Sequence, residues 1–296
     1  MRQRSKRFLA IWLCGLCLGW VWAAGPVWAE NEAVTAPAPA ASTEEDRPTA
    51  SFGVDIFSQY VWRGFALSRN SAVLQPSITV GYKGFSVNLW GNFDASENAP
   101  WALTPRTGAK WNETDFTFGY TREVYQGTWL KSLSLSLGGI YYAYDSTLYP
   151  QGDSFEITYG VTADFNYAVL AITANHEVLH YPGWLLTVGL SRKFDLPWYN
   201  LSLDLGHNFL FLFSRDWVAY PAKPFSNPDS TKAFNAPLAG QLYAALNIPV
   251  HKYVTISPKM GFWYALGGGS TELLRWGSWD AKHNHVYGGL NVTFAF

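Results

Sequence analysis

The chain has few charged residues and almost no cysteine. Of its 296 residues, 15% are charged, whereas about 25% is usual for soluble domains. The two cysteines, Cys14 and Cys17, lie within the first 29 residues, so a protein processed behind them has neither disulfide nor thiol chemistry. No apolar run of helical-span length follows residue 29, and a transmembrane helix needs about 20 such residues. Two fold classes remain: a soluble all-β protein, or a barrel with one apolar face.

Residues 1–29 are typical of a secretory signal peptide. An apolar stretch over 8–22 leads to the small-residue cleavage pattern Val27-Trp28-Ala29. An uncleaved membrane anchor is the alternative, but the apolar stretch is short for one. The basic residues that precede it are Arg2, Arg4, Lys6 and Arg7. Removing these four of the 21 basic residues leaves 17 against 22 acidic ones, a net charge of −5. No basic cluster remains to bind nucleic acid.

The remaining chain divides into a tail and one domain. Residues 30–50 consist largely of Ala, Pro, Glu and Thr, with no aromatic residue. Such a segment cannot bury enough apolar surface to fold, so we expect a disordered periplasmic tail, with a docking segment as the alternative. Residues 51–296 form the second part, in which apolar and polar residues alternate.

This alternation predicts membrane-spanning β-strands. Near the C-terminus, Leu290 and Phe294 share one face while Asn291 and Thr293 share the other, because successive strand side chains point to opposite faces. An even strand count brings both termini to the same side, and closure leaves no unpaired edge in lipid. We therefore expect an all-β, single antiparallel up-and-down barrel of about twelve strands with both termini periplasmic; ten or fourteen strands are the alternatives. The predicted segments are 51–63, 73–82, 84–94, 112–125, 131–144, 153–164, 167–178, 184–194, 199–214, 238–248, 253–265 and 283–296.

The connections between these segments differ in length according to their order. The second, fourth, sixth, eighth and tenth are short, whereas the odd-numbered ones include 95–111, 215–237 and 266–282. Short turns at one end and long loops at the other are typical of bacterial outer-membrane barrels. A soluble sandwich has no reason to sort its connections in this way.

Aromatic residues gather near the predicted strand ends, as they do in the girdles at the two bilayer interfaces. Trp90 and Trp263 fall mid-strand and are predicted to face the lumen. One girdle, beside the short turns, comprises Trp129, Trp198, Tyr82, Tyr125, Tyr199 and Tyr253. The opposite one comprises Trp62, Trp101, Trp111, Trp184, Trp217, Trp276 and Trp279.

The last strand looks like the C-terminal signal of outer-membrane barrels, which in that group is read by the barrel-assembly machinery. The matching residues are Leu290, Val292, Phe294 and Phe296. The first 45 or so barrel residues also resemble a porin-like proteobacterial family labelled TorF-type. Its Tyr-x-x-Arg-Gly, Leu-Gln and Gly-Phe patterns are matched by Tyr60, Arg63, Gly64, Leu74, Gln75, Gly84 and Phe85. This resemblance implies an outer-membrane barrel with porin activity, itself largely inferred for the family, and the rest of the chain fits as a generic barrel.

Alternation also assigns polar residues to the lumen. Acids outnumber bases among them, so the lumen should mildly favour cations and weakly polar solutes. The alternative is that Asp55, Arg63 and Lys259 belong to a salt-bridge network that fills a closed barrel. Barrels of about eight strands are filled by side chains and those of about sixteen leave a channel, so twelve lies between. The predicted lumen residues are Asp55, Gln59, Arg63, Gln75, Asp94, Asp115, Glu123, Glu156, Asp164, Glu177, Asp204, Gln241 and Lys259.

No residue set has a clear metal-binding or catalytic pattern. Asp280, His283 and His285 suggest a metal site, but a further ligand at a recognised spacing is missing. We expect neither metal nor cofactor. A lipid-acting enzyme needs a nucleophilic Ser beside a His and an orienting group. His207 lies near Asp204 without a serine motif, so we do not expect an enzyme.

The sequence therefore predicts an outer-membrane channel for passive diffusion of small hydrophilic solutes. Its expected partners are outer-membrane lipid, the barrel-assembly machinery and those solutes, with no nucleic acid; a homo-oligomer is left open. The main alternative is a closed structural barrel whose long loops bind a surface partner. Loop 215–237 is the candidate, as an exterior contact or as an inward constriction, because function often gathers on long loops.

Overall fold

The computed structural model describes residues 47–98, 100, 108–144, 152–197 and 199–296. The predicted signal peptide, most of the predicted tail, Trp101 and Trp198 lie outside the described residues. The first strand begins at Thr49, so the last two residues assigned to the tail belong to the barrel.

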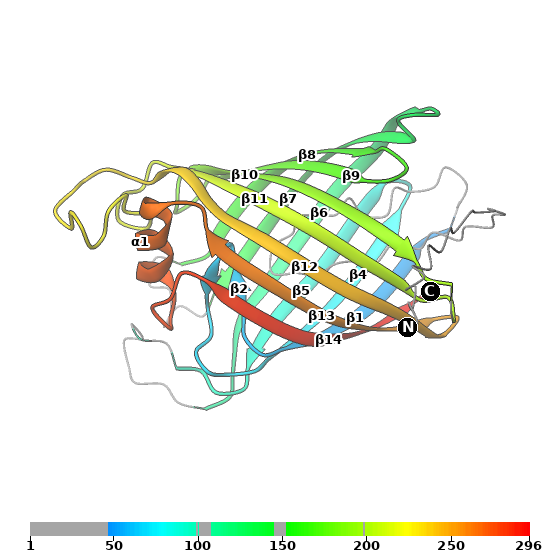
Figure 1. Ribbon diagram of the computed structural model, residues 1–296, viewed down its shortest axis with the longest axis horizontal. Coiled ribbons are helices and arrows are strands. Elements are labelled where there is room, and N and C mark those ends of the chain that lie inside the picture. The colour runs from blue at the N-terminus through cyan, green and yellow to red at the C-terminus, as the bar shows by residue number, and fades with distance from the viewer. Residues whose placement is uncertain (1–46, 99, 101–107, 145–151, 198) are drawn as a thin grey trace, which may run out of the picture.

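Twelve antiparallel strands form a closed barrel in which each strand pairs with its neighbours in the chain and the first closes against the last (Figure 1). This confirms the predicted fold class and strand number. The strands are β1 Thr49–Phe57, β4 Val73–Tyr82, β5 Phe85–Asp94, β6 Lys110–Gln126, β7 Ser132–Tyr144, β8 Ser154–Asp164, β9 Val169–Glu177, β10 Gly183–Asp195, β11 Ser202–Ser214, β12 Asn235–His251, β13 Val254–Ala265 and β14 His285–Ala295.

The two faces of the barrel wall differ in the way that the alternation predicts. On β1, Phe52 and Ile56 are exposed on the outside, whereas Asp55 is fully buried on the inside. The outer face continues around the barrel through mid-strand residues such as Leu137 and Ile172, which are also exposed. The barrel therefore presents an apolar outer surface and keeps most of its polar strand residues within.

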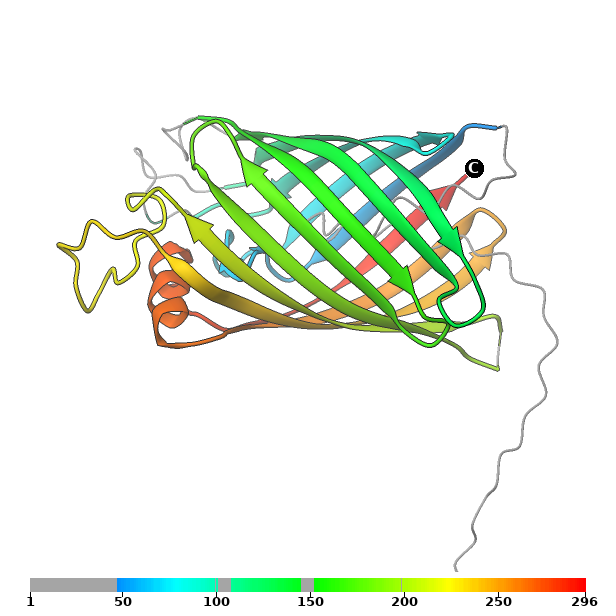
Figure 2. The same cartoon turned by 90° about the horizontal axis from the view of Figure 1, so that it is seen from above.

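Connections of different length are sorted to the two ends of the barrel. Thr49 of β1 pairs with Gly81, directly before the two-residue turn Lys83-Gly84. We call this the turn end; the C-terminal strand also finishes there (Figure 2). Lys83 and Gly84 both have positive φ, as a type I′ hairpin turn requires. The other connections lie at the opposite end, which we call the loop end; all of them are long except 178–182.

The first predicted strand, 51–63, is too long. β1 ends at Phe57, and residues 58–72, which we call the inner loop, turn into the barrel instead of continuing the wall. The inner loop contains a small hairpin, β2 Val61–Trp62 and β3 Phe65–Ala66. Its turn, Arg63-Gly64, again has positive φ at both residues. Arg63 therefore enters the interior from a loop and not from a strand. Gln59, also predicted to line the lumen from a strand, lies in the same loop and donates from Nε2 to Val286 O of β14 at 3.3 Å, an exposed contact.

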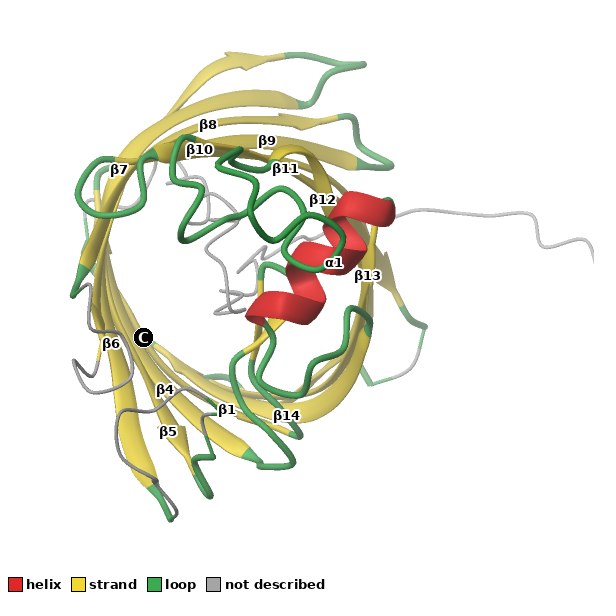
Figure 3. Cartoon of the chain, turned by 90° about the vertical axis from the view of Figure 1, so that its left-hand side faces the viewer, coloured by secondary structure: helices red, strands yellow, loops and turns green. Residues whose placement is uncertain are grey.

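The helix α1, Gly268–Gly277, lies across part of the loop-end mouth (Figure 3). Leu273 and Leu274 of α1 pack with Phe65 of the inner loop and with Phe234, which ends the loop between β11 and β12. Inward-facing Leu210 also joins this group, which we call the mouth cluster. Within the described residues, no helix is long and apolar enough to cross a bilayer. The mouth cluster is thus an apolar core inside the barrel, separate from the apolar outer face.

Most described residues of the predicted girdles are exposed at the strand ends. Trp129 and Tyr199 are exposed at the turn end, and Trp111 and Trp217 at the loop end. Trp279 is an exception, since it is buried and its backbone N–H donates to Ala66 O of the inner loop at 2.9 Å. Trp62 is also misassigned, because it belongs to the inner hairpin. The predicted interior residues Trp90 and Trp263 are buried.

Candidate functional site

The inner loop reaches across the interior to a group of acids on β6, β8 and β9. Arg63 donates two hydrogen bonds to the Glu156 carboxylate, each 2.7 Å long, and a third of 3.4 Å to the Tyr142 hydroxyl. The Tyr60 hydroxyl donates to Glu113 Oε2 at 2.8 Å. Both ends of the Arg63–Glu156 pair are buried. A planar guanidinium matches a carboxylate in this bidentate geometry, so the pair fixes orientation as well as charge.

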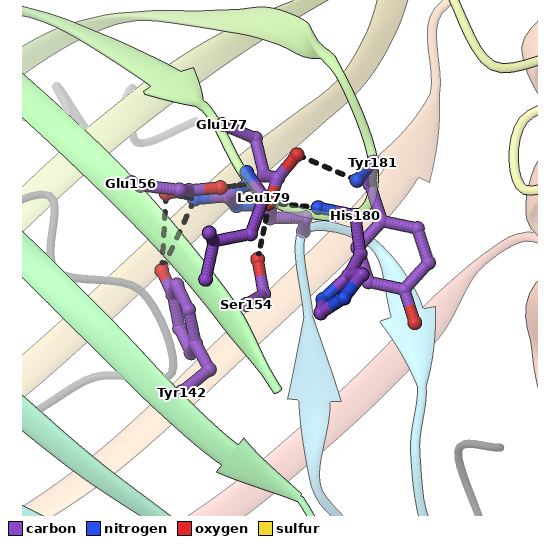
Figure 4. Close-up of polar contacts among 8 residues, drawn as sticks. Tyr142, Ser154, Glu156, Glu177, Leu179, His180 and Tyr181 are labelled. Atoms are coloured by element: carbon purple, nitrogen blue, oxygen red, sulfur yellow. Dashed lines mark hydrogen bonds and ion pairs between the residues drawn. The ribbon is translucent and has the colours of Figure 1, made fainter. Parts of the chain in front are cut away.

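The neighbouring acid, Glu177, ends β9 and binds the tight turn that follows. Its carboxylate accepts hydrogen bonds from the backbone N–H groups of Leu179, His180 and Tyr181, and from the Ser154 hydroxyl at 3.0 Å (Figure 4). Three backbone donors satisfy a buried carboxylate well. Glu177 therefore has a structural role in positioning the 178–182 connection beside Glu156.

We call Glu113, Asp115, Glu156 and Glu177 the acidic wall. Strand register brings them together, since Glu156 pairs with Glu177 and Asp115 pairs with Tyr142 of β7, next to β8. Alternation identified three of these acids from the sequence and missed Glu113, which lies two residues before Asp115 on the same face. The same alternation that assigned Asp115 to the interior would also have assigned Glu113.

Two tyrosines in the loop-end connections have raised pKa values, to which the nearby acids contribute. Burial raises the pKa of Tyr181 to about 12, with Glu177 and Asp216 adding to the effect. Burial also raises the pKa of Tyr220 well above its usual value, with Arg63 opposing and Glu156 reinforcing that rise. Both phenols are thus neutral at physiological pH.

A second polar network lies on the opposite side of the interior. Lys259 Nζ donates to Asp55 Oδ1 at 2.8 Å, and Asn291 Nδ2 donates to Asp55 Oδ2 at 3.0 Å. Nearer the turn end, Asn247 bridges Asp204 and Ser257 at 2.6 and 2.8 Å. Asp55, Arg63 and Lys259 are therefore all paired, Lys259 with Asp55 and Arg63 with Glu156.

Several predicted lumen residues have other surroundings. Asp94 is buried and accepts hydrogen bonds from the Ser71 hydroxyl and the Ser96 N–H, so it anchors the end of the inner loop. Asp164 pairs with Lys131 at 3.2 Å beside a turn. Glu123 lies near the same turn end and is partly exposed. Asp164 and Glu123 lie at the turn end, away from the acidic wall, whereas Asp94 lies two residues from Asn92, the register partner of Glu113. The assignment of all three as pore-lining stays a prediction.

The histidines considered as metal-binding or catalytic candidates have other surroundings. His207 lies on the outer face, where its Nε2 is 2.6 Å from the Tyr264 hydroxyl, while Asp204 and Asn208 face inward. His285 Nδ1 lies 3.5 Å from a carboxylate oxygen of Asp280. Among the described residues, no group of three or more His, Cys, Asp or Glu side chains is placed to hold a metal.

A protein-family model matches residues 41–209, more than half of the chain, and its description is "Bacterial protein of unknown function (Gcw_chp)". The chain belongs to the Gcw_chp family. The match covers β1 to β10 entirely and the inner loop, so both sides of the Arg63–Glu156 contact fall within the family region of this Gcw_chp protein. Curated proteins include no match to it. The TorF-type resemblance stays a prediction.

The fold of this Gcw_chp protein is similar to solved outer-membrane barrels. The NanC porin is 7% identical, with a TM-score of 0.49 over 83% of this chain and 98% of that one. The KdgM porin in complex with disordered oligogalacturonate is 10% identical, with a TM-score of 0.45 over 84% and 99%. Outer membrane phospholipase A from Escherichia coli is 12% identical, with a TM-score of 0.42 over 83% and 92%. No TM-score here reaches 0.5, so the strand pairing itself, and not this likeness, defines the barrel.

Proposed function

We propose that the protein is an outer-membrane channel through which small hydrophilic solutes diffuse passively. The observation that carries the proposal is the opposite character of the two faces of a closed barrel. Exposed apolar residues such as Leu137, Val161 and Ile172 surround its middle, while buried polar residues line the interior. In a bilayer this arrangement places apolar groups against acyl chains and satisfies every strand hydrogen bond within the ring.

Delivery to the outer membrane is part of the proposal. Residues 1–29 would direct secretion, and the final strand would be recognised by the assembly machinery. Leu290 and Phe294 of β14 are exposed on the outer face, and Phe296 follows at the turn end. N-terminal sequencing of protein from isolated outer membranes tests the first point, with Glu30 as the expected first residue.

The path through the barrel is expected to be narrow and to favour cations. The inner loop, α1 and the loop from 215 to 234 occupy part of the loop-end mouth, as Figure 3 shows for α1. We expect the remaining route to pass the acidic wall, where acidic side chains outnumber the one guanidinium. A field of this sign raises the local concentration of cations relative to anions.

Planar-bilayer recording of refolded protein tests this function. Discrete conductance steps are expected, with a reversal potential in a salt gradient that shows cation preference. Asp204→Lys, which places a positive charge on the inner face, should shift that potential toward anions. Asp229→Lys, at an exposed position of the β11–β12 loop, is the matched control and should shift it less.

A closed barrel that binds a surface partner is the second candidate. The mouth cluster favours it, because Leu273, Leu274 and Phe65 build an apolar core where an open channel would hold water. If the refolded barrel shows no conductance in bilayers, and no inner-loop substitution induces conductance, the second function is favoured over the channel.

A further inference from the structure

The guanidinium of Arg63 occupies the acidic wall as a ligand would. It enters from a loop, is 5% exposed, and places two nitrogens on the two oxygens of one carboxylate. Trp62 lies against it, with the guanidinium carbon 4.4 Å from the ring centroid, and Tyr142 adds a hydroxyl on its edge. A carboxylate fork, an aromatic face and a polar edge are the features by which proteins recognise planar organic cations.

The surroundings of this contact keep further acceptors unused. Asp115 Oδ1 is shielded from solvent and accepts no hydrogen bond. One layer toward the turn end, Thr158 and Asn175 lie on the same inward faces as Glu156 and Glu177, and they pair with each other in register. They are 5% and 3% exposed, and Thr158 Oγ1 and Asn175 Oδ1 also have no partner. Buried polar atoms are normally satisfied, so unused acceptors beside an acidic wall point to a donor-rich ligand as their missing partner.

We infer that the acidic wall is a recognition site for solutes that carry a guanidinium group, and that Arg63 is its tethered occupant. This inference rests on the proposed channel function and names its substrate class. An entering solute would take the place of the Arg63 side chain on Glu156 and donate its remaining N–H groups toward Asp115, Thr158 and Asn175. Only the Arg63 side chain must move, because the inner hairpin is held independently through Ala66, whose N–H donates to Ser278 Oγ at 3.1 Å.

Glu156 is the residue expected to determine specificity. Its two oxygens each accept one bond from a planar fork, a geometry that a compact ammonium group cannot reproduce. The site should therefore prefer methylguanidinium to methylammonium. It should reject urea, which has nearly the same shape as guanidinium but no charge to offset the desolvated carboxylates.

The test removes the tethered group and supplies a free one. The full mature chain with Arg63→Ala is refolded in detergent and titrated with methylguanidinium, methylammonium or urea at constant ionic strength, with the thermal midpoint as readout. Methylguanidinium should raise the midpoint with a dissociation constant on the order of 1 mM, the range expected for one small ion at one site. Arg63→Ala/Glu156→Gln should lose at least tenfold in affinity. Arg122→Ala, an exposed position on β6, should behave like the parent protein, which binds more weakly because Arg63 competes.

Bilayer recording on the same proteins separates this inference from the channel proposal. Arg63→Ala channels that methylguanidinium blocks, and urea does not, support both. Arg63→Ala channels that conduct but neither bind nor respond to methylguanidinium overturn the recognition site and leave the channel standing. A silent Arg63→Ala barrel that still binds methylguanidinium through Glu156 retains the site and overturns the channel.

Loss of folding is also informative. Arg63→Met keeps the aliphatic stem against Trp62 and is the second variant. If both variants fold only when methylguanidinium is present during refolding, the free ion has replaced the tethered one and the site is supported. If methylguanidinium restores the folding of neither variant, the inference is overturned.

Discussion

Replacing Lys259 by methionine tests whether the barrel interior is dry at the level of the Lys259–Asp55 pair. Methionine keeps most of the lysine stem but removes the charge. The two side chains are 4% and 0% exposed, and the nitrogen and oxygen lie 2.8 Å apart. After the substitution, the Asp55 carboxylate would retain the Asn291 amide as its other hydrogen-bond donor.

The size of the effect follows from this burial. Removing one partner of a buried pair costs about 3–5 kcal/mol, because the other charge is left unpaired in a poorly solvated site. An exposed pair contributes about 0–1 kcal/mol. Since Asn291 still solvates Asp55, we expect Lys259→Met to lower the free energy of unfolding by about 3 kcal/mol. Asp55→Asn in the same chain should restore about 2 kcal/mol, because it removes the orphaned charge.

Urea unfolding of the barrel folded into lipid vesicles, followed by tryptophan fluorescence, measures both values. The parent protein, the two single variants and the double variant complete a double-mutant cycle. A loss below about 1 kcal/mol for Lys259→Met would mean that water reaches the pair. The interior on that side would then be a hydrated pore, and the reasoning from burial would be refuted.

Three other outcomes follow from the structure. A methyl group on Gly261 would lie 2.3 Å from a tyrosine ring on the next strand, so Gly261→Ala should lower the free energy of unfolding by about 1–3 kcal/mol. Gly53→Ala is the control: its methyl group would lie 3.3 Å from the nearest atom, and it should cost less in the same urea assay. Leu137→Arg, in the middle of the outer face, should destabilise the barrel in vesicles by about 2–4 kcal/mol, whereas Leu179→Arg in a connection should be nearly neutral; equal losses would contradict the membrane placement. Hydrogen bonds from the β11–β12 loop, chiefly from Ser226, lower the pKa of Glu272, so this contact is complete above pH 4.5 and is lost as the pH falls through the lowered pKa. Because pepsin's own activity changes with pH, its rate of cutting that loop is compared at each pH with the rate for Glu272→Ala. The two rates should converge as the pH falls, and a constant ratio would contradict the contact.

The barrel wall could be predicted from the sequence because its physical constraint acts on every second residue. The last strand was expected over 283–296 and is found at His285–Ala295. Side chains there must suit either an apolar outside or a polar inside, so the period-two pattern records the strand directly. Closure also follows, since lipid offers no hydrogen-bond partner to an unpaired strand edge.

The inner loop could not be distinguished from a strand by the same pattern. Its residues alternate too, because Tyr60 and Trp62 meet aromatic side chains while Arg63 meets acids. The missed signal was the Arg63-Gly64 pair between two short β-forming dipeptides, the same turn chemistry as Lys83-Gly84 between β4 and β5. Alternation shows that the two faces of a segment meet different surroundings, but it does not show whether one of those surroundings is lipid.

The hydrogen bond from Ala66 to Ser278 joins positions separated by 212 residues, at opposite ends of the barrel sequence. Such a contact forms only after the intervening chain has been brought round, which makes it one of the most non-local contacts of the fold. The packing of the inner loop against the mouth cluster therefore cannot be completed until the β13–β14 connection is in place. A folding intermediate that lacks β14 therefore lacks both the β1–β14 pairing and the complete mouth cluster. Addition of the last strand completes both.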